Sequence, residues 1–159
     1  MASKLILMRH GSVDNIPDPP LNFIGLTEAQ MAAEKIASWK VTDVFSSPSK
    51  RCLSTAKILS KPFKKEVRVE DGLKENLHWD RLLAFIETAR KMDGANILAI
   101  NHANVMRTLL VNSFKVEPSK VDTARINPLS YAVIELDGAG KATLEKGLEF
   151  MFSESSKMM

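Results

Sequence analysis

The stretch LILMRHG, residues 5–11, decides the fold that this sequence predicts. Its first four residues form an unbroken apolar run, which is typical of a strand buried on both faces of a parallel sheet. The run passes directly into Arg9, His10 and Gly11. Because open parallel sheets bind ligands outside the carboxyl ends of their strands, these three residues point to a binding site.

Two later strand-like runs end in the same manner. Residues 44–48 (VFSSP) lead to Arg51, and residues 97–101 (ILAIN) lead to His102. If all three runs are neighbouring parallel strands, their basic residues meet at one edge of one sheet. We therefore expect two histidines and two arginines to form a site for a dianion such as a phosphate.

Strand-like and helix-like patterns alternate along the rest of the chain. This alternation predicts an α/β fold with a mostly parallel central sheet between two layers of helices. The expected strands cover residues 4–8, 43–46, 67–69, 96–101, 131–136 and 142–148. The expected helices run from Thr27 or Asn22 to about 39, from Ser47 to about 60, over about 80–92, and onward from His102, with a short helix after Pro118.

Capping residues favour particular starts for the first two helices. Thr27 with Gln30 three positions later forms a capping box, whereas Asn22 is an alternative N-cap upstream. Ser47 followed by Pro48 favours a start of the second helix there, with the serine as N-cap. Arg51 would then occupy about the fourth position of that helix and lean back toward the ligand edge.

Composition narrows the class of protein. The chain has 159 residues and a formal net charge of +3, which fits one domain over residues 1–152, with residues 153–159 as a disordered tail. It lacks a dense basic module for nucleic acid, an apolar run of membrane-spanning length and a signal-peptide layout, so no nucleic acid or membrane partner is expected. The single Cys52 excludes an internal disulfide and fits a cytoplasmic location.

The residue types of the expected site suit phosphate chemistry. A histidine that attacks phosphorus must be neutral, and neighbouring arginines would lower the pKa of His10. Gly11 would let the main chain approach a ligand closely. The main-chain N–H groups of Ala103 and Asn104, at the start of the fourth helix, would point at the same anion. Each feature alone has ordinary structural explanations, so the prediction rests on their combination.

Together these stretches resemble the histidine phosphatase superfamily, in its phosphoglycerate-mutase-like branch. The resemblance rests on LMRHG (7–11), SSPxxRxxxTA (46–56) and NHANVMR (101–107), and it extends from about residue 5 to 136. It implies a phosphoglycerate-mutase-like, three-layer α/β fold. Only residues 60–74 are available for a lid, so no large lid insertion is expected.

The resemblance implies a role for each residue of the site. His10 would be the nucleophile that accepts the phosphoryl group, while Arg9, Arg51 and His102 would bind the phosphate. No metal and no cofactor are required by this scheme. The second histidine usually precedes a glycine in the family, whereas here residues 103–104 are alanine and asparagine.

Other family positions are matched less closely. The proton donor usually stands in a Leu-x-Glu context, which indicates Glu75, with Asp71 and Asp80 as competitors. A loop asparagine that often touches phosphate is matched nearest by Asn15, at a spacing about one residue short. The family's Leu-Thr-x-x-Gly segment appears as LNFIG (21–25), which favours the earlier start of the first helix.

The resemblance predicts a phosphatase that hydrolyses a phosphomonoester through a phosphohistidine on His10. Glu75 would protonate the leaving oxygen and then activate water. Three alternatives stay open: a protein phosphohistidine phosphatase, phosphoglycerate-mutase-type transfer, and a non-catalytic module that binds phosphorylated ligands. The expected partner is a phosphorylated small molecule or protein. The substrate itself and the oligomeric state are not determined by the sequence.

Overall fold

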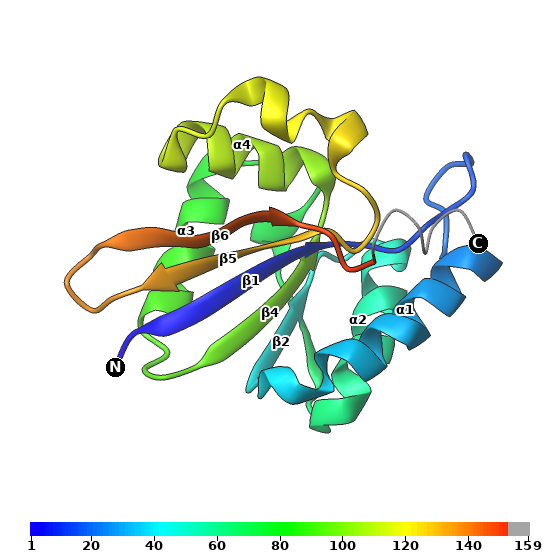
Figure 1. The fold of residues 1–159 in the computed structure, drawn as a ribbon, viewed down its shortest axis with the longest axis horizontal. Helices are drawn as coiled ribbons and strands as arrows, with labels where there is room; N and C mark the ends of the chain where they lie inside the picture. Colours follow the sequence, from blue (N-terminus) through cyan, green and yellow to red (C-terminus); the bar gives the residue numbers. More distant parts are fainter. Residues whose placement is uncertain (153–159) are drawn as a thin grey trace.

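The computed structural model describes residues 1–152, which form one six-stranded sheet between two layers of helices (Figure 1). The order of strands across the sheet is β3-β2-β4-β1-β5-β6. The strands are β1 (Ser3–Arg9), β2 (Asp43–Ser46), β3 (Val67–Val69), β4 (Asn96–Asn101), β5 (Tyr131–Leu136) and β6 (Ala142–Glu149). The first four strands in this order are parallel, while β5 and β6 are antiparallel to their neighbours. The predicted α/β class is confirmed.

Four helices cover the two faces of the sheet. The helices α1 (Phe23–Ile36) and α2 (Lys50–Ser60) pack on one face, and α3 (Trp79–Arg90) and α4 (Ala103–Phe114) pack on the other. Short 3₁₀ segments complete the described chain at Ala37–Trp39, Lys61–Phe63, Asp71–Leu73, Pro118–Val121 and Thr123–Arg125. None of the helices in residues 1–152 has the length and apolar character that a membrane crossing requires.

The central strand β1 explains why its sequence is apolar without interruption. Leu5 and Leu7 belong to the core beneath α3 and α4, whereas Ile6 and Met8 belong to the core beneath α1 and α2. Successive side chains of a strand point to opposite faces, and here both faces are covered. The run therefore buries apolar surface in both cores at once.

The helix α1 begins at the earlier of the two predicted positions. The side-chain oxygen of Asn22 accepts a hydrogen bond from the main-chain N–H of Gly25 at 2.8 Å. The favoured start at Thr27 is wrong, because its hydroxyl instead donates to the carbonyl oxygen of Phe23 at 3.0 Å inside the helix. Gly25 lies so close to the first loop that an added Cβ would stand 2.2 Å from the carbonyl oxygen of Ser12.

The helix α2 begins later than predicted. Its N-cap is Ser49, whose hydroxyl accepts from the N–H of Cys52 at 3.4 Å, so the prediction of Ser47 is wrong by two residues. The reason is that the N–H of Ser47 still donates to the carbonyl oxygen of Ile100 at 3.0 Å, which extends the hydrogen bonding of the sheet. Arg51 consequently occupies the second position of the helix rather than the fourth.

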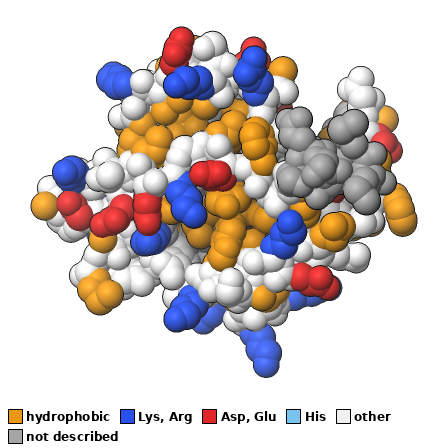
Figure 2. Space-filling model, in the orientation of Figure 1, with side chains coloured by type: hydrophobic (Ala, Val, Ile, Leu, Met, Phe, Trp, Pro, Cys, Tyr) orange, Lys and Arg blue, Asp and Glu red, His pale blue; other side chains and the backbone are white. Residues whose placement is uncertain are grey.

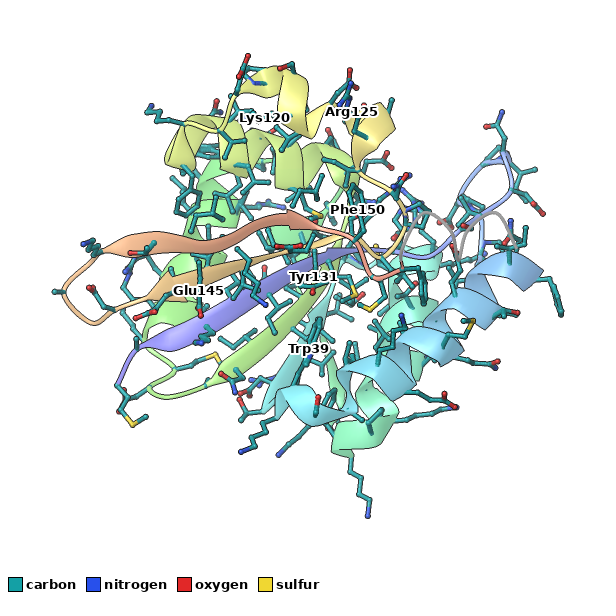
Figure 3. All side chains as sticks on the ribbon, viewed as in Figure 1. Trp39, Lys120, Arg125, Tyr131, Glu145 and Phe150 are labelled. Carbon is teal, nitrogen blue, oxygen red and sulfur yellow. The ribbon has the colours of Figure 1, made fainter. Side chains whose placement is uncertain are left out.

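One face of the sheet is only partly covered by helices (Figures 2 and 3). A hollow of about 250 Å³ lies there, and its lining includes Trp39 and Tyr131, whose ring centroids are 4.9 Å apart. Lys4 and Glu145, which form an ion pair at 2.9 Å, also line it. Its lining contains no histidine, so it is separate from the predicted phosphate site. The predicted tail, residues 153–159, lies outside the described residues.

Candidate active site

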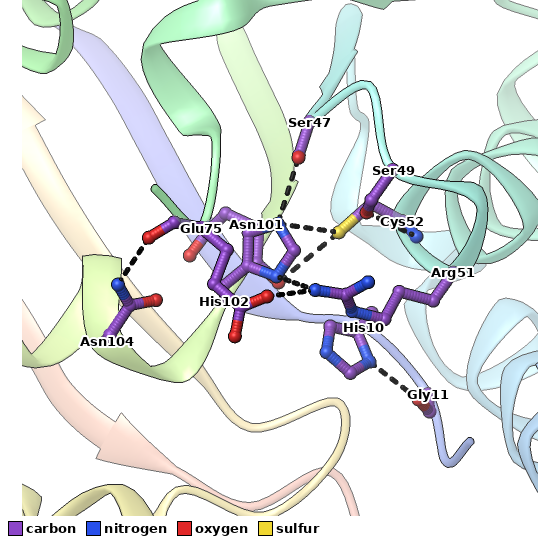
Figure 4. A network of polar contacts seen from close by, with 10 residues as sticks. All are labelled: His10, Gly11, Ser47, Ser49, Arg51, Cys52, Glu75, Asn101, His102 and Asn104. Atoms are coloured by element: carbon purple, nitrogen blue, oxygen red, sulfur yellow. Dashed lines mark hydrogen bonds and ion pairs between the residues drawn. The ribbon is translucent and has the colours of Figure 1, made fainter. Parts of the chain in front are cut away.

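The carboxyl ends of three parallel strands bring the predicted basic residues together (Figure 4). His10 directly follows β1, and His102 directly follows β4. Their rings approach edge to face, with centroids 5.5 Å apart. Arg51 arrives from the first turn of α2, and one of its terminal nitrogens lies 3.3 Å from Nδ1 of His102.

His10 is held with one ring nitrogen free. Its Nδ1 lies 2.7 Å from the carbonyl oxygen of Gly11, and because a carbonyl can only accept, Nδ1 carries the hydrogen. Burial of the ring is the main cause that lowers the pKa of His10 to about 4; the charges of Arg9 and Arg51 act in the same direction, and the hydrogen bond to Gly11 opposes them. The imidazole is therefore neutral near pH 7, with its lone pair on Nε2.

His102 is buried beside the same cations. Its Nε2 lies 2.9 Å from the hydroxyl oxygen of Ser47. Burial lowers the pKa of His102 to about 3, with Arg51 as the next largest cause and His10 and Arg9 after it. Like His10, this ring is neutral near pH 7 in the absence of an anion.

The two arginines make the pocket cationic. One terminal nitrogen of Arg9 donates to the carbonyl oxygen of Ile126 at 2.5 Å, while its Nε is buried and has no hydrogen-bond partner among the described residues. A buried donor without an acceptor is costly, and an anion in the pocket would supply one. The Arg51 side chain is mostly buried and forms an ion pair with the carboxylate of Glu75.

Of the three candidate proton donors, Glu75 is the one whose carboxylate contacts the pocket. Its side chain is 63% exposed and reaches Arg51 from the loop before α3. Asp71 instead pairs with Lys74 at 3.7 Å. Asp80 lies in the first turn of α3. The arrangement thus places one exposed carboxylate at the mouth of a buried cationic pocket.

Of the three other predicted binding residues, Ala103 and Asn104 lie next to the pocket, whereas Asn15 is not joined to it in the described part of the chain. Ala103 and Asn104 form the first turn of α4, with their main-chain N–H groups next to His102. The amide nitrogen of Asn104 donates to the carbonyl oxygen of Glu75 at 2.6 Å, so this side chain is used to hold the Glu75 loop. Asn15 is exposed, and within residues 1–152 no hydrogen bond joins it to the pocket.

Two residues make supporting contacts that were not predicted from the sequence: Thr55 was not singled out, and Ser47 was considered only as a helix cap. The hydroxyl of Thr55 accepts from the N–H of Gly11 at 3.1 Å and donates to the carbonyl oxygen of Arg51 at 2.8 Å, which ties α2 to the loop after β1. Ser47 contacts His102. Both residues lie within the SSPxxRxxxTA stretch, so the motif contained the signal, although it did not reveal what each residue contacts.

The site has the donor set of an anion pocket rather than that of a metal centre. Within the described part of the chain, no group of three histidine, cysteine, aspartate or glutamate side chains is placed to hold a metal ion. Cys52 lies 3.6 Å from Nε2 of His102, but burial raises the pKa of its thiol to about 11. It is therefore a neutral thiol near pH 7, which is a poor metal ligand.

Sequence comparison connects the first half of the chain to a known family. Residues 5–78 match the model of the histidine phosphatase superfamily (branch 1). A stretch of 77 residues is 38% identical to ubiquitin-associated and SH3 domain-containing protein A of Mus musculus, covering 45% of this chain and 12% of that protein. The chain thus spans about an eighth of the length of this relative.

Structural comparison extends the likeness over nearly the whole chain. Phosphoserine phosphatase of Entamoeba histolytica, in complex with 3-phosphoglyceric acid, superposes with a TM-score of 0.75 at 17% identity, covering 93% of this chain and 98% of that one. The protein histidine phosphatase SixA, complexed with tungstate, superposes with a TM-score of 0.76 at 18% identity, covering 92% and 96%. At these identities the likeness establishes the fold, which is the one the sequence predicted.

Proposed function

We propose that the chain is a member of the histidine phosphatase superfamily (branch 1), whose model matches residues 5–78, and that it hydrolyses a phosphomonoester through a covalent phosphohistidine on His10. One observation carries this proposal. The hydrogen bond from Nδ1 of His10 to Gly11 leaves the Nε2 lone pair free in a pocket that also holds Arg51 and His102. A neutral nucleophile beside fixed cations is what attack on a phosphate dianion requires.

In the first step, Nε2 of His10 attacks phosphorus in line with the ester oxygen. The P–N bond forms as the P–O bond breaks, and the leaving oxygen takes a proton from the carboxylic acid of Glu75. Arg9 and Arg51, together with His102 once a proton lies between its ring and the anion, hold the equatorial oxygens, whose charge is spread in the transition state. Each such donor contributes about 2.7–4 kcal/mol to lowering the barrier.

In the second step, the Glu75 carboxylate takes a proton from a water molecule, whose oxygen attacks the phosphohistidine. The P–N bond breaks, its electron pair returns to Nε2 of His10, and inorganic phosphate leaves. The exposed position of Glu75 suits this role because solvent water can reach its carboxylate.

The ion pair between Arg51 and Glu75 has to rearrange when substrate binds. In the free protein, the carboxylate uses a guanidinium that the phosphate would also need. A phosphate dianion offers more charge and more acceptor oxygens than a carboxylate, so it competes for Arg51. Glu75 is then released toward the leaving oxygen at the mouth of the pocket.

The experiment that tests this proposal traps the covalent intermediate. The full chain is mixed with a labelled phosphomonoester and denatured in alkali, and protein-bound label is measured before and after acid treatment. We expect acid-labile label on the natural protein and on a His78→Ala control, and none on His10→Ala. Label that persists in His10→Ala, or that survives acid, would contradict the proposal.

A protein phosphohistidine phosphatase is the second candidate, and the ion pair of the Glu75 carboxylate with Arg51 favours it. An imidazole leaves phosphorus more readily than an alkoxide, so such a reaction depends less on a free general acid. The fold likeness to the protein histidine phosphatase SixA is consistent with this candidate. The values of kcat/KM of the natural protein separate the two: a higher value for a phosphohistidine peptide than for phosphomonoesters indicates the second function, and the reverse order indicates the first.

A further inference from the structure

Ser47 has no role in the reaction described above, yet it contacts a residue of the pocket. Its hydroxyl oxygen lies 2.9 Å from Nε2 of His102, and both side chains are buried (Figure 4). The N–H of Ser47 donates to the carbonyl oxygen of Ile100, which fixes the serine main chain at the edge of the sheet. The hydroxyl is therefore held at one position relative to the imidazole.

The contacts of His102 determine which ring nitrogen carries its hydrogen. A guanidinium can only donate, and a terminal nitrogen of Arg51 lies 3.3 Å from Nδ1. Nδ1 is therefore the acceptor, and the single hydrogen of the neutral ring is on Nε2. That hydrogen is donated to the hydroxyl oxygen of Ser47.

We propose that Ser47 is a positioning residue that holds His102 in the tautomer protonated on Nε2, so that the lone pair of Nδ1 faces the phosphoryl group. The tautomer is a property of the free protein. Only the identity of the anion rests on the proposed phosphatase function.

This tautomer has a consequence for anion binding. A phosphate oxygen is an acceptor, and so is Nδ1 of His102, so the two can form a hydrogen bond only if a proton lies between them. The proton enters either on the phosphate monoanion or from solvent onto the imidazole. Binding of each anion therefore takes up one proton from solution above the second pKa of phosphate, and affinity falls as pH rises.

Removing the Ser47 hydroxyl should allow the anion to bind without the uptake of a proton. When the anion binds, Arg51 donates to it instead of to Nδ1, so the hydrogen bond from Nε2–H to Ser47 is what keeps the hydrogen on Nε2. In Ser47→Ala that partner is missing, and the neutral ring can carry the hydrogen on Nδ1, which binds a dianion without proton uptake. The charged and titratable groups that face His102 are Arg9 at the end of β1, His10 directly after it, and Arg51 and Cys52 of α2. Glu75, in the loop before α3, reaches Arg51 beside them. All of them remain in the variant.

The first test reads the tautomer directly. Long-range ¹H–¹⁵N spectra of the full chain, labelled at its three histidines, distinguish a protonated ring nitrogen from an unprotonated one. The signals of His102 are assigned by their loss in His102→Gln. We expect hydrogen on Nε2 of His102 at pH 7. Hydrogen on Nδ1 in the free natural protein would overturn the inference, whether or not the protein proves to be a phosphatase.

The second test measures the affinity of inorganic phosphate by calorimetry from pH 7 to 8.5. We expect the natural protein to lose affinity about tenfold per pH unit, since one proton is taken up. Ser47→Ala should show a shallower dependence and about tenfold lower kcat/KM, and Ser47→Thr, which keeps the hydroxyl, should restore both. An identical pH dependence in Ser47→Ala and the natural protein would overturn the inference.

A matched control is available at the far end of α2. Ser60 is also buried, and its hydroxyl makes one hydrogen bond to the carbonyl oxygen of Lys57 at 3.1 Å, at the end of α2 remote from Arg51. Ser60→Ala removes a hydroxyl of equal size without touching His102. It should retain the pH dependence and the kcat/KM of the natural protein. A change in Ser60→Ala as large as that in Ser47→Ala would count against a positioning role.

Discussion

At the residue scale, burial has more influence than neighbouring charge on the state of the two pocket histidines. Removal from water is the largest cause of the low pKa values of His10 and His102, and the arginines add to it. The sequence indicates the arginines because Arg9 adjoins His10 and Arg51 follows another strand-like run. It does not show how deeply the rings lie, so it underestimates the main effect.

The dependence of the free energy of unfolding on pH follows from these two pKa values. His10 and His102 have pKa values of about 4 and 3 in the folded protein, against about 6.5 when unfolded, so the unfolded chain binds more protons between these limits. The free energy of unfolding is therefore highest above pH 6.5 and falls as pH drops toward 4. Between pH 6.5 and 5 each histidine contributes a loss of at most about 2 kcal/mol.

Urea unfolding at pH 7 and pH 5 measures this contribution. We expect the doubly substituted His10→Gln, His102→Gln protein to lose less stability between the two pH values than the natural protein. Comparing the losses of stability of the two proteins between the two pH values removes the effect of the carboxylates, which both proteins share. Equal losses in the two proteins would show that the histidines titrate normally.

Arg51 provides a second prediction at the residue scale. Its guanidinium contacts both His102 and Glu75, and a planar fork with several donors suits a phosphate better than a single ammonium does. We expect Arg51→Ala to lower kcat about 10²–10³-fold and Arg51→Lys to recover only part of that loss. Steady-state kinetics on a phosphomonoester decide this, with Lys50→Ala as the neighbouring exposed control. Full activity in Arg51→Lys would show that a point charge suffices.

At the element scale, α1 is positioned by the closeness of its first turn to the loop after β1. A Cβ on Gly25 would lie 2.2 Å from the carbonyl oxygen of Ser12 and 2.9 Å from its nitrogen, so one of the two segments would have to move. The N–H of Ser12 also donates to the carboxylate of Glu28 at 3.0 Å. Through these contacts α1 supports the loop that begins at Gly11.

Gly25→Ala should therefore weaken both the fold and the site. We expect a loss of about 1–3 kcal/mol in the free energy of unfolding, with lowered kcat because the segment next to His10 shifts. Gly138→Ala is the matched control, since a Cβ there meets nothing within 4 Å, and its effect should stay within about 0.5 kcal/mol. Chemical denaturation of the two variants makes the comparison. Similar stability in both would show that α1 adapts without cost.

At the scale of the whole molecule, the sheet brings the groups of the proposed phosphate pocket together from distant parts of the chain. The strands β1, β4 and β2 are adjacent and parallel, so His10, His102 and the turn before Arg51 meet at one edge. The antiparallel β5 extends the sheet on the other side of β1. The pocket therefore depends on strand order, and its cations come from protein side chains.

This arrangement leads to a prediction about metal removal. Because Arg9, Arg51 and His102 supply the groups that stabilise the transition state in the proposed reaction, phosphatase activity should not change when EDTA is added. The assay compares turnover of a phosphomonoester with and without EDTA, with added Mg²⁺ and Zn²⁺ as further conditions. Activity that is lost with EDTA and restored by one of these ions would contradict the metal-free scheme.

Much of the fold could be predicted because it depends on local patterns. The strands at 43–46, 67–69, 96–101 and 131–136 occur where the apolar runs and turn residues indicated them. Helix starts were less predictable: the capping box at Thr27 is a sound local signal, but contact with Ser12 favours Asn22 instead. The predicted start of α2 at Ser47 was wrong because the N–H of Ser47 still donates a hydrogen bond to the neighbouring strand.

The sequence by itself determined which groups follow the strand ends, and two histidines and two arginines there are sufficient to predict a phosphate site. Only the tertiary structure decided which of them contact each other, which carboxylate reaches them, and that Ser47 contacts His102 while Asn104 bonds the Glu75 loop. The physical reason is the separation along the chain over which each effect acts. Strand and turn preferences act between near neighbours in sequence, whereas burial, ion pairing and imidazole tautomers depend on groups that only the folded sheet brings within a few ångströms of one another.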